Sequence, residues 1–218
     1  MTRVAVVVEG PTEETFLRDV LAPVLAERSI TFYPRTLRGN TNYQRVKSIV
    51  VRQLKQDPTA YCSTMLDLYG LGRGFPGGPF PANLPSAERA RRLEEAMKTE
   101  ICEEIADFRP DVRFIPYLQL HEYEALLFSD PIAFASGIGQ PQLASRFQQI
   151  RDEFPTPEDI NDNPRTAPSK RVASVFPSYQ KVLEGTLAAR AVGVERMRQE
   201  CPHFHEWVQR LEALESDR

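Results

Sequence analysis

The stretch that decides the fold is "VAVVVEGPTEETFLRDVLAPVLAER", which occupies Val4–Arg28. Its first five residues, Val4–Val8, are all apolar and predict a buried β-strand. Glu9 stands where this strand must end, because a Gly-Pro pair follows it, and two further acids, Glu13 and Glu14, come soon after. Acids in the first turn of a helix favourably meet the positive end of the helix dipole, which accounts for Glu13 or Glu14. Glu9 lies outside that turn and therefore needs a second explanation.

The rest of this stretch predicts an amphipathic helix over Glu13–Arg28, with Thr12 as its N-cap. Pro23 lies inside the helix and predicts a kink. The apolar residues recur on one face, at Phe16, Leu17, Val20, Leu21, Val24 and Leu25. A strand that runs directly into such a helix is typical of α/β proteins.

Composition and charge are those of an ordinary globular protein. The chain has 218 residues, of which 41% are hydrophobic and 26% charged. No apolar run approaches the roughly 20 residues of a membrane helix, and the first strand is too short for a signal-peptide core. Three scattered cysteines, Cys62, Cys102 and Cys201, form no CxxC motif and indicate a cytoplasmic location. A net charge of -3 neither indicates nor excludes nucleic-acid binding.

Strand and helix signals alternate through the first part of the chain. Further strands are predicted over Thr31–Leu37, Ala60–Leu66 and Arg113–Leu120, and helices over Asn42–Lys55 and Ser86–Phe108. Pro34 places the strand that contains it at the sheet edge, Ser86 is the expected N-cap of its helix, and the Gly/Pro-rich segment Tyr69–Pro85 is expected to be a loop. Strands separated by helices predict an α/β fold with a mostly parallel sheet of about four strands flanked by helices.

From about Ile132 onward the sequence changes character. Prolines cut this part into short helical pieces without strand patterns, at Pro141, Pro155, Pro157, Pro164, Pro168, Pro177 and Pro202. The final helix is expected over roughly Pro202–Glu215, because apolar residues recur there at helical spacing. We therefore expect an α/β domain over residues 1–131 and an α-helical C-terminal annex over residues 132–218 that packs on it.

Acids follow three of the four predicted strands. Glu9 follows the first, Asp67 the third, and Glu122 and Glu124 the fourth, while Glu13 lies one helical turn beyond Glu9. In an open parallel sheet, ligands bind outside the carboxyl ends of the strands. Several carboxylates in one crevice repel one another unless a cation neutralises them, and Mg²⁺ prefers oxygen ligands of this kind. The sequence therefore predicts a metal site, most simply for phosphoryl-ester chemistry.

The motif "VVVEGPTEETFL" resembles the first motif of Toprim domains, in the form seen in OLD-family nucleases. Together with "MLDLYG", "YLQLHEYEALLFSD" and "PSKR…PSYQKVL", it resembles a bacterial family of uncharacterised proteins classed with the Toprim fold, over most of the chain. The resemblance implies that Glu9 serves in acid–base chemistry or metal binding and that Glu13 is an additional ligand. It further implies that Asp67 takes the place of the first Asp of a DxD motif that holds Mg²⁺.

The chain departs from that motif at Tyr69, which stands where the second Asp would be. Either Glu122, which we prefer, or Glu124 replaces the missing ligand, or the site is weaker or inactive. If the strand register continues, Glu122 and Glu124 share one face; if a helix begins at once, His121 and Glu124 share one instead. His121 is expected as a base or ligand, with a hydrogen-bonded structural histidine as the equal alternative.

Basic residues that could contact phosphates form two groups and one isolated lysine. They are Arg35 and Arg38 at the end of the second strand, Lys170 and Arg171 in "PSKR", and Lys181. A polyanion cannot approach the acids unaided, so we expect these residues at the rim of the crevice, with "PSKR" folded back toward the strand ends. Ordinary solvated surface charge is the alternative for each group.

Two other motifs carry no function. "GRGFPG" matches GxGxxG, but the neighbouring prolines prevent the helix that a dinucleotide site needs, and the chain has no GxxxxGK[ST] motif. "HFH" provides His203 and His205, which without a nearby thiolate pair make a poor zinc site and are expected on the surface.

These observations predict a Toprim-like α/β protein that is a Mg²⁺- or Mn²⁺-dependent nuclease or nuclease subunit, with Glu9, Asp67 and Glu122 as its catalytic residues. The resemblance implies a bacterial phage-defence setting with an ABC-type ATPase as partner. Nucleic acid is the expected substrate, no membrane is involved, and a homodimer is compatible with this interpretation. The leading alternative is a non-catalytic interaction subunit whose site Tyr69 disables. A third is a phosphotransfer or small-nucleotide enzyme that uses the same carboxylates.

Overall fold

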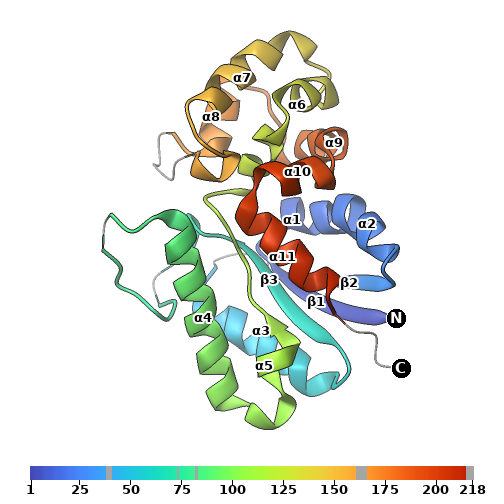
Figure 1. Ribbon diagram of the computed structural model, residues 1–218, viewed down its shortest axis with the longest axis vertical. Coiled ribbons are helices and arrows are strands. Elements are labelled where there is room, and N and C mark those ends of the chain that lie inside the picture. Colours follow the sequence, from blue (N-terminus) through green and yellow to red (C-terminus); the bar gives the residue numbers. More distant parts are fainter. Residues whose placement is uncertain (38–40, 73, 82, 161–165, 215–218) are drawn as a thin grey trace.

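The sheet is parallel and is covered by helices on both faces, as predicted. A computed structural model describes residues 1–37, 41–72, 74–81, 83–160 and 166–214. Four strands pair in the order β2-β1-β3-β4, and β5 pairs with the end of β3 (Figure 1). Every pairing is parallel. The strands are β1 (Thr2–Val8), β2 (Ile30–Thr36), β3 (Tyr61–Asp67), β4 (Phe114–Ile115) and β5 (Leu118–Gln119).

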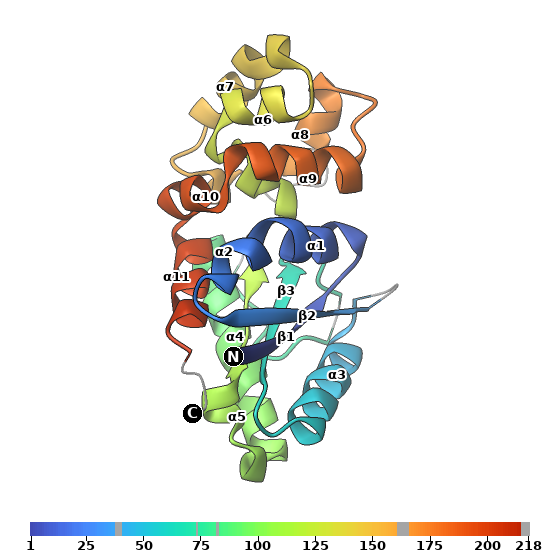
Figure 2. The same ribbon diagram turned by 90° about the vertical axis from the view of Figure 1, so that its right-hand side faces the viewer.

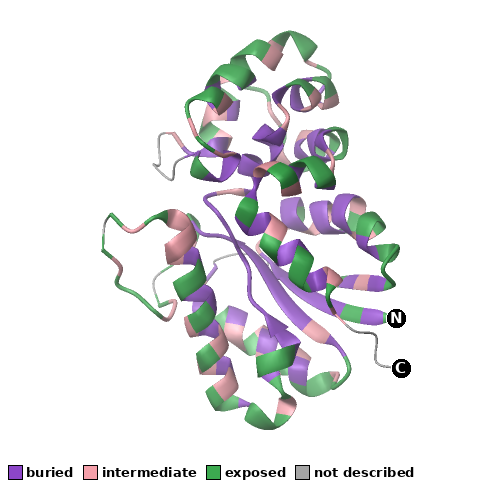
Figure 3. Cartoon of the chain, viewed as in Figure 1, coloured by how far each residue is buried: buried purple, intermediate pink, exposed green. Residues whose placement is uncertain are grey.

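The first strand is buried on both faces, which explains its unbroken run of apolar residues. Val4, Val6 and Val8 point into one hydrophobic cluster, while Ala5 and Val7 point into another. Strands β2 and β3 pair with β1 on either side, so β1 is central, and β2 with its Pro34 lies at the edge of the sheet. Strands β1 and β3 are accordingly buried along almost their whole length (Figure 3).

Helices from both ends of the chain cover the two faces of the sheet (Figures 1 and 2). One face carries α1 (Pro11–Phe16), the π-helical turn η1 (Leu17–Leu21), α2 (Ala22–Ala26) and the last helix, α11 (Pro202–Glu212). The other face carries α3 (Tyr43–Gln56) and α4 (Ser86–Glu104). Two short helical segments, η2 (Ala106–Phe108) and α5 (Pro110–Arg113), lead from α4 into β4.

The remaining helices lie beyond α1, on the side where β3 ends (Figure 2). They are η3 (Tyr123–Ser129), α6 (Pro131–Gly137), η4 (Pro141–Leu143), α7 (Ala144–Asp152), η5 (Pro157–Asp159), α8 (Pro168–Val175), α9 (Lys181–Val192) and α10 (Val194–Glu200). This confirms a helical C-terminal region. Among the described helices, none combines the length and the apolar character needed to cross a membrane.

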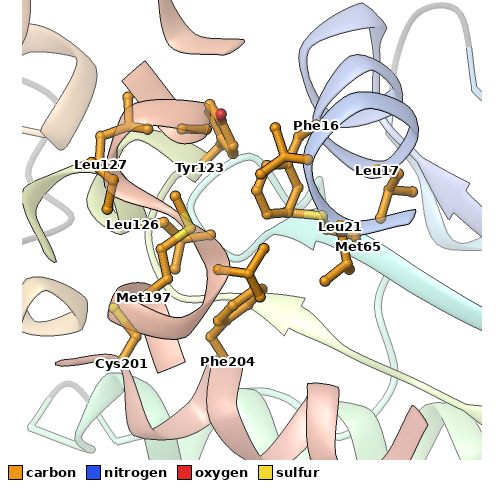
Figure 4. Close-up of a cluster of buried hydrophobic side chains, with 14 of the residues drawn as sticks. Phe16, Leu17, Leu21, Met65, Tyr123, Leu126, Leu127, Met197, Cys201 and Phe204 are labelled. Carbon is orange, nitrogen blue, oxygen red and sulfur yellow. The ribbon is translucent and has the colours of Figure 1, made fainter. Parts of the chain in front are cut away.

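One hydrophobic cluster joins the C-terminal helices to the sheet (Figure 4). Phe16 of α1 lies 5.3 Å, centroid to centroid, from the ring of Tyr123 and 6.2 Å from that of Phe204 in α11. Met65 of β3 and Leu126 of η3 belong to the same cluster. The proposed boundary near residue 131 stays a prediction, because the apolar side chains on its two sides are packed together.

The first helix differs from expectation at its start and at its kink. Gly10, not Thr12, is the N-cap, and Pro11 is the first helical residue, where its missing N–H costs nothing. The Gly10 N–H donates to the Glu13 carboxylate at 3.0 Å. The irregularity expected at Pro23 is a π-helical turn over Leu17–Leu21, which ends just before the proline. The helix that follows the loop likewise has Pro85 at its N-cap position, so Ser86 is its first residue.

The strand predicted over Arg113–Leu120 is split into β4 and β5. Pro116 has no N–H to give to a sheet ladder, so pairing stops there. The Thr64 hydroxyl fills the gap: it accepts from the Tyr117 N–H at 2.9 Å and donates to the Tyr117 carbonyl at 2.8 Å. Arg113 belongs to α5 instead of the strand.

Candidate functional site

Acids converge at the carboxyl ends of the two central strands. Glu9 follows β1 directly, and Asp67 is the last residue of its neighbour β3. Because the two strands are parallel, with Val8 opposite Met65, these residues meet at one edge of the sheet. The Asp67 N–H donates to Glu9 Oε1 at 3.1 Å and so joins the two strand ends.

Glu13 and Thr41, which lie outside the strands, are also neighbours of Glu9. Glu13, one turn along α1, is buried, with 5% of the residue exposed. The side chain of Thr41, also buried, hydrogen-bonds to Glu9. On the remaining side the chain carries Gly70, where a Cβ would lie 3.4 Å from both Glu9 carboxylate oxygens. Any larger residue at this position would press on the acid.

The segment after β5 brings two more acids to the same edge. Asp67 Oδ1 accepts from the Tyr123 N–H at 3.1 Å, which fixes this segment to the end of β3. Glu122 Oε2 accepts from the Ser169 N–H at 2.8 Å, so the first turn of α8 lies beside Glu122. We call Glu9, Glu13, Asp67, Glu122 and Glu124 together the acid cluster.

A lysine from α9 reaches the innermost of these acids. The side chain of Glu124 is 0% exposed, and its Oε2 lies 3.0 Å from Nζ of Lys181, whose own side chain is 41% exposed. Within the described residues, Oε1 of Glu124 accepts no hydrogen bond. Glu124 therefore has a buried carboxylate oxygen turned into the protein without a donor, which is costly for a charged group.

Burial and repulsion by neighbouring acids raise the pKa values of four members of the acid cluster, Glu9, Glu13, Asp67 and Glu124. Burial, followed by the charge of Glu13, raises the pKa of Glu9 from 4.5 to about 7. Burial raises the pKa of Glu124 to about 7 in spite of Lys181. Burial and then Glu13 and Glu9 hold the pKa of Asp67 well above its usual range, and burial also raises that of Glu13. Perturbed carboxyl groups that share one crevice are typical of functional sites.

The donor atoms suit a hard divalent cation, although they are not gathered around one point. Within the described parts of the chain, no group of three or more His, Cys, Asp or Glu side chains is placed to hold a metal ion. The carboxylates of the cluster are turned instead toward backbone N–H groups or toward Lys181. Carboxylate oxygens are nevertheless the ligands that Mg²⁺ prefers, and the metal site stays a prediction.

Two of the predicted phosphate contacts are engaged elsewhere. Arg35 is exposed, and its Nε donates to Gln53 Oε1 at 3.2 Å on α3. Arg171 pairs with Glu153 at 2.8 Å, and its guanidinium lies 4.8 Å from the centre of the Phe154 ring. Both arginines therefore have structural contacts that already hold their side chains.

The other basic candidates differ in position. Lys170 is exposed on α8, one residue after the Ser169 N–H that binds Glu122. Lys181 is the basic candidate that touches the acid cluster among the described residues, and Arg38 lies outside them. Phosphate contact stays a prediction for all of them.

The histidines occupy positions that the sequence did not indicate. His121 is buried with a left-handed backbone (φ 61°), and its carbonyl accepts from the Tyr69 N–H at 3.1 Å. The prediction that His203 lies on the surface is wrong. It is buried at the start of α11, where Nε2 lies 2.9 Å from Glu94 Oε1 and the ring stacks on Tyr117. The burial follows from its helix position, since the apolar face of α11 packs against the sheet. His205 is half-buried.

Sequence reasoning missed three contacts around the acid cluster. Thr41 lies shortly beyond the end of β2, so the strand-end rule that selected the acids would also have selected its hydroxyl. The Ser169 N–H contact and the ion pair of Lys181 with Glu124 join segments that are 47 and 57 residues apart. No local pattern indicates such pairings.

Comparison with known proteins places the chain in one family. Residues 8–212 match the family described as a domain of unknown function (DUF4276). The match includes every member of the acid cluster and also Lys181. No curated protein and no solved structure matches the chain.

Proposed function

The chain belongs to the DUF4276 family, and we propose that it is a Toprim-type, Mg²⁺-dependent nuclease or nuclease subunit that hydrolyses phosphodiesters. The observation that supports this is the acid cluster. Its carboxyl groups at the ends of β1 and β3 have raised pKa values, as does Glu124, which pairs with Lys181 of α9. From the motif resemblance we further propose an ABC-type ATPase partner, a role in phage defence and a cytoplasmic location.

Glu9, Asp67 and Glu122 would hold the cation, Mg²⁺ or Mn²⁺, with Glu13 and Glu124 near a second one. When bound, such a cation polarises a phosphoryl oxygen and lowers the pKa of a bound water. Without a cation the pKa of Glu9 is about 7, so in an arrangement in which Asp67 and Glu122 hold the cation, Glu9 would instead serve as the general base that takes a proton from the attacking water.

Three other groups around the acid cluster would favour substrate binding. The Tyr123 N–H orients the Asp67 carboxylate. Lys181 adds positive charge to otherwise anionic surroundings, which would help a phosphate to approach. Gly70 leaves the approach to Glu9 free of a side chain.

The Glu9→Gln variant tests this function. It preserves the shape of the side chain and the acceptor for the Asp67 N–H, but removes the charge and the base. We expect metal-dependent cleavage to fall to background while circular dichroism shows an unchanged fold. Glu14→Gln is the matched control, because Glu14 lies close to Glu9 in the chain, in the first turn of α1, and accepts from the Thr36 hydroxyl at 2.7 Å, outside the cluster.

The assay uses single- and double-stranded DNA and RNA with Mg²⁺, Mn²⁺ or EDTA, with and without any ATPase encoded beside the gene. If the wild type cuts none of these substrates, the nuclease proposal fails. The second candidate function is then favoured, a Toprim-fold interaction subunit. The observation behind it is Tyr69, an exposed aromatic residue where the resemblance expects a metal-binding acid.

A further inference from the structure

A pocket lined by aromatic side chains lies in the loop that follows β3. Its volume is about 380 Å³, within the range of small-ligand sites. Tyr69 is 39% exposed, and Phe75 and Phe80 are half-buried. The loop that carries them projects beside the start of α4 (Figure 1). We define the aromatic pocket by its main lining residues, Tyr69, Leu71, Phe75, Phe80 and Arg89.

The backbone of the pocket is tied to its surroundings. The Phe75 ring packs against α3, where its centroid lies 5.4 Å from that of the buried Tyr43 ring. A Cβ at Gly72 would lie 2.8 Å from the Thr41 carbonyl oxygen, so the loop packs there against the residue whose side chain binds Glu9. Phe75 and Phe80 thus pack partly against the hydrophobic cluster beneath α3 and α4, while Tyr69 stays exposed at the surface.

The aromatic pocket begins where the acid cluster ends. Tyr69 is two residues from Asp67, and its N–H is held by the His121 carbonyl at 3.1 Å. The next residue, Gly70, donates its N–H to the Asp67 carbonyl at 3.0 Å and faces the Glu9 carboxylate. A molecule whose phosphate lies at the acid cluster can therefore extend an adjoining group into the aromatic pocket.

We propose that the aromatic pocket receives an unpaired nucleobase, so that the preferred substrate is a single strand or an unpaired end. This inference rests on the proposed nuclease function and names its substrate class. Aromatic rings stack on any nucleobase, whatever the sequence of the strand. The positive charge of the Arg89 guanidinium attracts the phosphates of the nucleic acid. A base inside a duplex has both faces covered by its neighbours and cannot enter. Tyr69 would thus be a base platform at the position where the motif resemblance expects an acid.

The experiment measures binding separately from cleavage. Fluorescence anisotropy follows a labelled 15-nucleotide oligo(dT) and a labelled 15-base-pair duplex, both in Mg²⁺, on Glu9→Gln protein that also carries Tyr69→Ala, Tyr69→Phe or Tyr33→Ala. Tyr33 is an equally exposed tyrosine, at 41%, on the edge strand β2. Loss of one stacking contact should weaken oligo(dT) binding about 5- to 150-fold for Tyr69→Ala. Tyr69→Phe, which keeps the ring, and Tyr33→Ala should stay within about twofold.

Each outcome decides between the two proposals. If Tyr69→Ala weakens oligo(dT) binding but not duplex binding, the pocket is a base site, even should the wild type cut nothing. Unchanged oligo(dT) binding, or an equal loss for both ligands, overturns the pocket proposal and leaves the nuclease proposal to its own cleavage assay. If the parent Glu9→Gln protein binds neither ligand, the pocket proposal also fails, and an apolar peptide becomes the expected occupant.

Discussion

The Glu9→Gln variant should be more stable than the wild type above neutral pH, with little difference in acid. Burial, followed by the charge of Glu13, raises the pKa of Glu9 from 4.5 to about 7. A carboxyl group with a higher pKa in the folded state holds its proton more tightly when the chain is folded. The contribution of protonated Glu9 to the free energy of unfolding is therefore fully present below pH 4.5. It is lost as the pH rises through about 7.

The size of the effect follows from the two pKa values. The rise from 4.5 to about 7 sets an upper limit of about 3 kcal/mol on the loss well above pH 7. Solvent screens a half-buried carboxylate, so we expect a gain of about 1–2 kcal/mol for Glu9→Gln at pH 8.5 and under about 0.5 kcal/mol at pH 5. The amide keeps an oxygen that can accept from the Asp67 N–H, so the hydrogen bond contributes little to the difference.

Urea unfolding between pH 5 and 8.5 in EDTA measures this difference. Glu14→Gln is again the control, since it removes one charge from the neighbouring helix α1 without touching the cluster, and its effect should vary little with pH. A Glu9→Gln variant that is less stable than the wild type at pH 8.5, or a gain that is the same at every pH, would refute the argument.

Two further substitutions test contacts around the site. Lys181→Met should leave Glu124 buried without its ion-pair partner, raise the pKa of Glu124 further and destabilise the protein at pH 8.5. We expect about 1–3 kcal/mol, less than the roughly 3–5 kcal/mol of a fully buried pair because the Lys181 side chain is 41% exposed. An unfolding midpoint in urea equal to that of the wild type would contradict this. Glu94→Gln should weaken the contact with His203, whose pKa is lowered by burial but raised overall by Glu94 and Glu158 together. A histidine with a raised pKa stabilises the fold below about pH 6.5 and loses this contribution as the pH rises, so the destabilisation of about 1–2 kcal/mol should be larger at pH 5.5 than at pH 8.5. Equal losses at both pH values would argue against a charged His203.

The elements around β1 could be predicted because their signals are local. The five apolar residues from Val4, the edge proline of β2 and the apolar run of β3 placed three strands to within one or two residues of the observed bounds. The fourth strand is interrupted at Pro116, which the sequence shows, but the Thr64 hydroxyl that bridges the gap is 53 residues from Tyr117. Sequence periodicity carries no information about such a partner.

The acids of the site could be found for a related reason. Glu9 and Asp67 end parallel neighbouring strands, and the topology alone brings them to one edge. Their orientation could not be found, because it depends on which backbone N–H group each carboxylate meets after folding. The burial of His203 escaped prediction in the same way, since it requires knowing which face of α11 packs on the sheet.

The acid cluster lowers the stability of the chain, and this is the best argument that it serves a ligand. A buried ion pair such as Glu124 with Lys181 is weak evidence for stability, because apolar residues in its place would do as well. Several further acids around one lysine leave negative charge uncompensated. A cation that binds the ionised carboxylates displaces their protons and neutralises their charge. Its binding therefore offsets the stability that the folded chain loses when these groups ionise. Mg²⁺ should therefore stabilise the wild type more at pH 8.5 than at pH 5, and should stabilise Glu9→Gln less than the wild type at pH 8.5. Equal stabilisation of both proteins by Mg²⁺ would place the bound ion away from Glu9.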